Sequence, residues 1–74
     1  MTNLIVAIGE TAGKVWRHLA ADGEQSVSQV ALALDEPVER VALAVGWLAR
    51  EGKIVLKNEG GSVVFALKEN DENW

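Results

Sequence analysis

Few side chains in this 74-residue chain could carry out chemistry. The chain has one histidine, His18, and no cysteine. A metal site needs three or four converging nitrogen, oxygen or sulfur ligands, and a general base needs a partner within hydrogen-bond reach. Because a lone histidine meets neither requirement, we expect His18 to be a surface residue of a helix. We predict a protein that is not an enzyme and uses no metal or cofactor.

The serines and glycines also lack the neighbours that a reactive site would need. Ser26, Ser28 and Ser62 have no histidine or lysine at a motif spacing. Gly9 and Gly13 are not followed by the Gly-Lys-Ser/Thr ending of a phosphate loop. Each costs about 1 kcal/mol relative to alanine inside a helix, so close packing could offset that cost. The partner in such packing is either another helix of the same chain or a second subunit.

Cationic side chains along the chain's third predicted helix and the following hairpin could bind phosphate. The candidate DNA contacts are Arg40, Arg50, Lys53 and Lys57. The same helix face also carries Glu36 and Glu39, which would repel phosphates, and the whole chain has a formal net charge of −4. Nucleic-acid-binding proteins usually present a basic face. A transcriptional regulator that contacts duplex DNA through this helix and the following hairpin is therefore the alternative hypothesis, disfavoured by the acidic charge.

The centre of this outward helix face is apolar instead of polar. The candidate residues for a dimer or partner interface are Leu43, Ala44, Gly46 and Trp47. Tryptophan is enriched at interface hot spots, and a Leu–Trp pair is an unusual group to leave in water. Two readings remain open: Trp47 folds back onto the domain and fills its core, or it contacts a partner, most simply in a two-fold homodimer.

The first half of the chain should contain two helices joined by a short strand. Helical spacing of apolar residues from Leu4 to Leu19 predicts a first helix over residues 4–21, with Leu4 on its inward side and Thr2 or Asn3 as its cap. Asp22 and Gly23 end it. We expect an extended segment at residues 24–27 and a second helix at 29–34, with Ser28 as its N-cap.

The second half should contain a helix followed by a hairpin. Asp35 is the expected N-cap of the third helix, Pro37 fits its first turn, and Gly52 its left-handed C-terminal cap. Val38 begins an expected inward face that is completed by Val41, Val45 and Leu48. Apolar residues alternate with other residues from Ile54 onward and again over residues 62–67. This pattern predicts two strands joined by a glycine-containing turn at residues 58–61.

The length allows one domain, which we place at residues 1–67, with a polar C-terminal tail at 68–74. A core this small contributes only about 3–5 kcal/mol, so self-association is a common way to add stability. No signal peptide or membrane span is visible in the sequence, so we expect a cytoplasmic protein.

Two segments also resemble a small, uncharacterised bacterial family of winged helix-turn-helix domains. They are IGETAGKVW at residues 8–16 and LAVGWLAREGKI at residues 43–54, and the resemblance extends over residues 4–67. It implies an α+β fold of three helices, a short strand and a C-terminal β-hairpin wing, together with a bacterial origin and dimerisation. It implies no established reaction or ligand. Our prediction is a non-enzymatic winged-helix protein that acts as a dimerising protein-interaction module.

Overall fold

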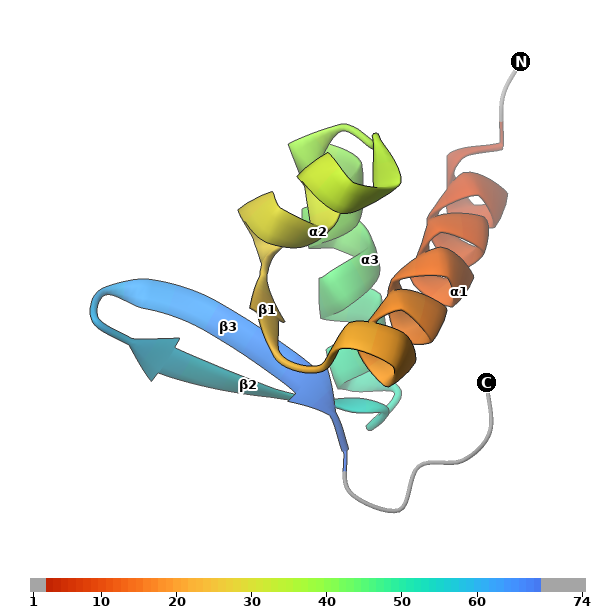
Figure 1. Cartoon of the computed structure of the whole chain (residues 1–74). Helices are drawn as coiled ribbons and strands as arrows, with labels where there is room; N and C mark the ends of the chain where they lie inside the picture. Colours follow the sequence, from red (N-terminus) through yellow and green to blue (C-terminus); the bar gives the residue numbers. More distant parts are fainter. Residues whose placement is uncertain (1–2, 69–74) are drawn as a thin grey trace.

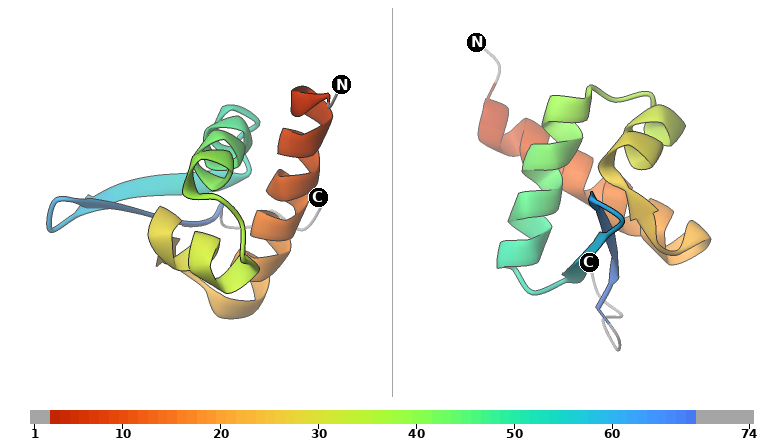
Figure 2. Two further views of the ribbon diagram at one scale, coloured as in Figure 1. Left: turned by 90° about the horizontal axis from the view of Figure 1, so that it is seen from above. Right: turned by 90° about the vertical axis from the view of Figure 1, so that its left-hand side faces the viewer.

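The computed structural model describes residues 3–68 and confirms the expected α+β winged-helix architecture. Its elements in chain order are α1 (Leu4–Asp22), β1 (Gln25–Ser26), α2 (Val27–Leu34), α3 (Val38–Arg50), β2 (Ile54–Glu59) and β3 (Ser62–Leu67). The three helices pack together at one end of an antiparallel sheet with the strand order β1-β3-β2. The β2–β3 hairpin extends away from them as the wing (Figure 1). The left view of Figure 2 shows the same separation of the hairpin tip from the helices, and the right view looks along the hairpin.

Helix α1 begins at a well-formed cap. The Asn3 Oδ1 accepts hydrogen bonds from the backbone N–H groups of Ile5 (3.1 Å) and Val6 (3.3 Å), as one of the two expected caps would. Thr2, the other expected cap, lies outside the described residues. The helix ends where Gly23 takes φ +79° and donates its N–H to the Leu19 carbonyl at 2.8 Å.

Helix α2 begins two residues earlier than predicted. Ser26, not Ser28, is its N-cap: the Ser26 hydroxyl accepts from the Gln29 N–H at 3.2 Å, and the Gln29 side chain accepts from the Ser26 N–H at 2.8 Å. This reciprocal capping box needs Gln or Glu three residues after the cap. Ser28 is followed at that distance by Ala31 and cannot form one. The early start shortens β1 to two residues.

The predicted start of α3 at Asp35 is also wrong. Asp35 is the left-handed C-cap of α2, with φ 55° and ψ 45°, and Pro37 is the extended N-cap of α3. A proline disfavours helical geometry in the residue before it, so the helix cannot start earlier than the proline. At the other end, the Gly52 prediction is confirmed: Gly52 has φ +74°, and the next N–H, of Lys53, reaches the Leu48 carbonyl at 3.0 Å.

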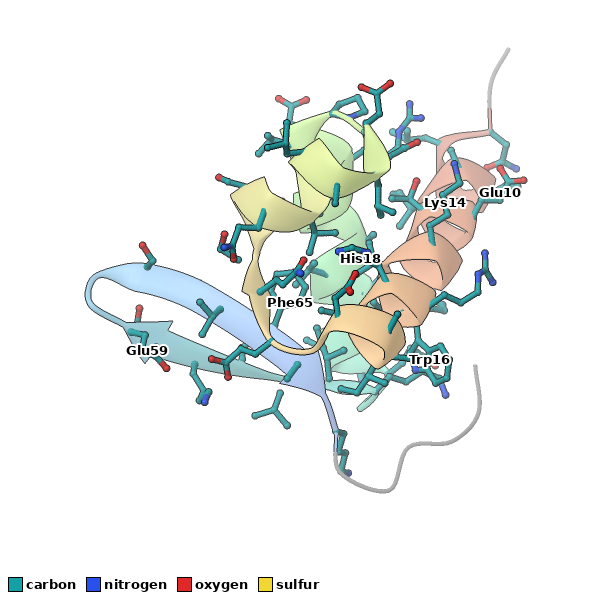
Figure 3. All side chains as sticks on the ribbon, in the orientation of Figure 1. Glu10, Lys14, Trp16, His18, Glu59 and Phe65 are labelled. Atoms are coloured by element: carbon teal, nitrogen blue, oxygen red, sulfur yellow. The ribbon has the colours of Figure 1, made fainter. Side chains whose placement is uncertain are left out.

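One core joins the helices to the sheet, and Phe65 of β3 lies at its centre with no exposed surface. Figure 3 shows this side chain between the sheet and the helices. The buried apolar residues are Ala12, Val15, Leu19, Val30, Ala31, Val41, Ala44, Val45, Leu48, Ile54 and Phe65. Val38 was expected among them but is 55% exposed, because it is the first residue of α3 and lies at the edge of the core.

The register of the hairpin separates its two faces. Leu56 pairs with Phe65 and Lys57 with Val64, and neighbouring residues along a strand point to opposite sides. Leu56 therefore shares the helix-facing side with Phe65, whereas Lys57 lies on the outer side. The tip is closed by Gly60 and Gly61, both with positive φ. None of the helices within residues 3–68 is both long and apolar enough to cross a membrane.

Candidate interaction surface

The outward face of α3 carries the apolar residues that its spacing predicted. Leu43 is 50% exposed and Trp47 is 41% exposed, and Gly46 beside them is exposed as well. Ala44 differs from the expectation, because it is completely buried against the core and cannot provide contact surface. The exposed part of the predicted interface is therefore Leu43, Gly46 and Trp47.

A residue from α1 joins this surface. Leu4, Pro37, Glu39, Arg40 and Leu43 line one shallow pocket of about 240 Å³ between the start of α1 and the start of α3. The sequence pattern assigned Leu4 to the inward side of its helix, but Leu4 is 54% exposed. Helical spacing gives direction around a helix but not how far the neighbouring elements extend, so the sequence held no signal for this exposure.

The first turn of α1 is only partly covered by the rest of the domain. Leu4, Ile5 and Val6 point in three different directions around the helix, yet their exposed fractions are 54%, 79% and 55%. All three are large and apolar. Only Leu4 of the three lines the pocket with Leu43, whereas Val6 lines another pocket, with Glu10 and Arg17. We call the pocket between the two helices, together with the exposed residues Leu4, Leu43 and Trp47, the α1–α3 surface.

The α1–α3 surface includes one residue of each charge. Glu39 and Arg40 line the same pocket, and Arg40 is half-buried there. Within residues 3–68 no ion pair engages either side chain. The neighbouring Glu36 is different, because it binds Lys14 at 3.2 Å and accepts from the buried Thr11 hydroxyl at 3.5 Å. That group ties α1 to the α2–α3 turn.

The four candidate DNA contacts lie on different parts of the molecule. Arg40 lies in the pocket beside Leu4, while Arg50 is exposed at the other end of α3, about 15 Å further along the helix. Lys53 is half-buried where the chain leaves α3 for β2. Lys57 lies on the outer face of the hairpin.

Lys57 is also engaged by carboxylates. Its Nζ lies 2.7 Å from the Glu24 Oε1 and 3.8 Å from the Glu59 Oε2. The hydrogen bond that Lys57 donates to Glu24, followed by the negative charge of Glu24, raises the pKa of Lys57 above the ordinary value of 10.5. A phosphate would have to compete with Glu24 for this ammonium group. The helix-facing side of the wing instead exposes Leu56 (44%) and Val63 (47%), which are apolar.

His18 is not the plain surface residue that we expected. Its Nδ1 lies 3.1 Å from the Asp22 Oδ2 and its Nε2 lies 2.8 Å from the Gln25 Oε1, and its side chain is 16% exposed. The histidine therefore links the end of α1 to β1. In the described part of the chain, no three His, Cys, Asp or Glu side chains are grouped so that they could hold a metal ion.

Fold and surface together define a winged-helix domain whose third helix exposes apolar residues. The chain belongs to the family described as "Winged helix-turn-helix domain (DUF2582)", which matches residues 1–67. One relative is the uncharacterized protein MJ1608 of Methanocaldococcus jannaschii, 44% identical over 64 residues that cover 82% of this chain and 90% of the relative.

Two solved structures are similar to this fold. The solution NMR structure of protein BT2368 from Bacteroides thetaiotaomicron has a TM-score of 0.79 and 37% sequence identity, covering 90% of this chain and 83% of that one. The crystal structure of the Zalpha domain of Carassius auratus PKZ in complex with Z-DNA has a TM-score of 0.74 and 19% identity, covering 84% of this chain and 98% of that one. At this identity the second likeness concerns the fold.

Proposed function

We propose that this protein is a non-enzymatic, cytoplasmic interaction module that works as a homodimer through the α1–α3 surface. One observation carries the proposal: Leu4 and Leu43 line one pocket although they come from different helices, and each leaves half of its surface in water. Trp47, one turn from Leu43, is also 41% exposed. Contiguous exposed apolar surface of this kind marks interaction sites in folded proteins.

The energetics of a small domain favour such an association. A core of this size contributes about 3–5 kcal/mol. Full burial of one large apolar side chain contributes about 1.5–3 kcal/mol, and half of that gain remains available to each half-exposed residue. Covering Leu4, Leu43 and Trp47 on both copies would therefore add stability comparable to that of the monomer, before the entropic cost of association.

A charge placed at Leu43 tests this proposal. We expect Leu43→Glu to lower the solution mass to that of a monomer by analytical ultracentrifugation, because it places a carboxylate in the buried centre of the interface. Leu32→Glu is the matched control: Leu32 is 85% exposed on α2, away from the pocket, and its variant should keep the wild-type mass. Circular dichroism would verify that both variants are folded.

A wild-type protein that sediments as a monomer at high concentration would contradict the homodimer. Trp47→Glu separates the two readings of the tryptophan. A folded monomer supports a contact role, while an unfolded variant indicates that the indole is part of the core and leaves Leu43 as the residue that decides the proposal.

Duplex DNA binding is the second candidate function, and the similarity to a Zalpha domain solved with Z-DNA favours it. Arg40, Arg50, Lys53 and Lys57 would be the phosphate contacts.

Substitutions in the wing and at the end of α3 test DNA binding. Because Glu24 engages Lys57, Glu24→Gln should strengthen low-salt binding to a mixed-sequence duplex, and Arg50→Ala should weaken it. Glu10→Gln makes the same change in net charge on the exposed side of α1 and is the control. Equal affinities for the Glu24 and Glu10 variants would count against a DNA-contacting wing.

A further inference from the structure

We infer that the partner at the α1–α3 surface is a second copy in which the first turn of α1 packs over the Leu43 pocket, with Glu39 facing the partner's Arg40. This inference rests on the proposed homodimer and specifies its arrangement. In a two-fold dimer each contact occurs twice, so Leu4 meets the partner's Leu43 while Leu43 meets the partner's Leu4.

The composition of the pocket is what selects a second copy. A two-fold interface must complement itself, and this pocket holds one acid, one base and two leucines within the same small area. A surface that had evolved for a strongly charged partner would instead show one sign of charge. A two-fold axis that passes between Glu39 and Arg40 would place unlike charges together and apolar groups together.

The two charged side chains of the pocket, Glu39 and Arg40, form no ion pair within residues 3–68. Glu36, three residues before Glu39, is satisfied inside the chain by Lys14 and Thr11. Glu39 and Arg40 have no such ion pair within residues 3–68, although Arg40 is half-buried. A guanidinium that becomes covered in an interface gains most from a carboxylate, and in this arrangement the partner supplies it.

The first turn of α1 supplies the apolar half of the contact. Leu4, Ile5 and Val6 are all at least half exposed around the helix, so the elements within residues 3–68 cover the turn only in part. The Asn3 cap nevertheless holds it in helical form. A preformed apolar turn beside a shallow pocket is suited to pack against the equivalent turn and pocket of a second copy.

Charge reversal tests the pairing directly. Glu39→Arg and Arg40→Glu should each weaken self-association by at least about tenfold, because like charges would face each other across the axis. An equimolar mixture of the two variants should dimerise again as a mixed pair, detected by native mass spectrometry. A chain with both changes should pair with itself but not with the wild type, a preference that altered stability alone would not produce.

Cross-linking tests the position of the turn. The natural chain has no cysteine, so single cysteines can be introduced without competing thiols. Chains with Leu4→Cys and chains with Leu43→Cys, mixed and oxidised, should cross-link rapidly. The same Leu43→Cys chains mixed with Leu32→Cys chains should cross-link slowly, because Leu32 lies outside the pocket.

The outcomes separate this inference from the proposed function. If Leu43→Glu breaks the dimer but charge reversal and its mixture leave the affinities unchanged, the homodimer stands and this arrangement is overturned. If wild-type protein is a monomer, both fail. Slow cross-linking between Leu4 and Leu43 positions, at the rate of the Leu32 control, would also overturn the arrangement.

Discussion

At the scale of single residues, two glycines of this chain should respond in opposite ways to the same substitution. Gly52 has φ +74°, where a side chain is strained, and an added Cβ would meet no atom within 4 Å. The cost of replacing Gly52 by alanine is therefore purely conformational. Gly9 is an ordinary helical residue in α1, and a Cβ there would likewise meet nothing within 4 Å. The expectation that a helix of the same chain crosses closely at Gly9 is thus wrong for this position.

We expect Gly52→Ala to lower the free energy of unfolding by about 1–2 kcal/mol, the cost of the left-handed conformation for an L-residue. Gly9→Ala should raise it by about 1 kcal/mol, through helix propensity. Urea unfolding followed by circular dichroism measures both. If Gly9→Ala instead weakens self-association, a second subunit approaches that face of α1, which was the other reading of the two glycines.

At the scale of elements, α2 is positioned by its cap more than by its length. The helix has eight residues, too few to be stable without neighbours, and the Ser26–Gln29 capping box fixes where it starts. That start in turn fixes β1 as the two residues that pair with β3 at Phe65 and Val64.

Ser26→Ala should therefore destabilise the protein by about 1 kcal/mol, the usual cost of losing an N-cap side chain. Ser28→Ala should change stability by less than about 0.5 kcal/mol, because Ser28 is exposed and its hydroxyl caps nothing within the described residues. Chemical denaturation of the two single variants gives the comparison. Equal losses for both serines would contradict the assigned start of α2.

The element order could be predicted from the sequence because periodicity and glycines are local signals. Two predicted helix starts, at Ser28 and Asp35, were wrong. Ser26, two residues before Ser28, is the N-cap of α2 because it forms the capping box with Gln29, and Asp35 is the C-cap of α2 and not the N-cap of α3. The exposure of Leu43 and Trp47 followed from spacing. The burial of Ala44, the exposure of Leu4 and the Glu24–Lys57 pair depend on packing between distant segments, which no local pattern encodes.

At the scale of the whole molecule, charge and apolar surface support the protein contacts that we propose. The net charge is −4, and the four candidate phosphate contacts are spread over both ends of α3 and the outer face of the wing. The α1–α3 surface, in contrast, combines neighbouring apolar residues with a balanced pair of charges. The winged-helix fold is thus known for this chain, and we propose the α1–α3 surface as the face through which it acts.

The capped first turn of α1 has a consequence for how the chain behaves on dilution. Asn3 holds the turn through its side chain and through its carbonyl, which accepts from the Ala7 N–H at 3.1 Å, but within residues 3–68 its apolar side chains are left half or more exposed. Helix ends without packing fray readily. In the proposed dimer the turn is covered, so mass action would couple its order to concentration. The length of α1 would then depend on the concentration of the protein. The helix would be complete at concentrations where the dimer forms, and one turn shorter at concentrations where the monomer predominates.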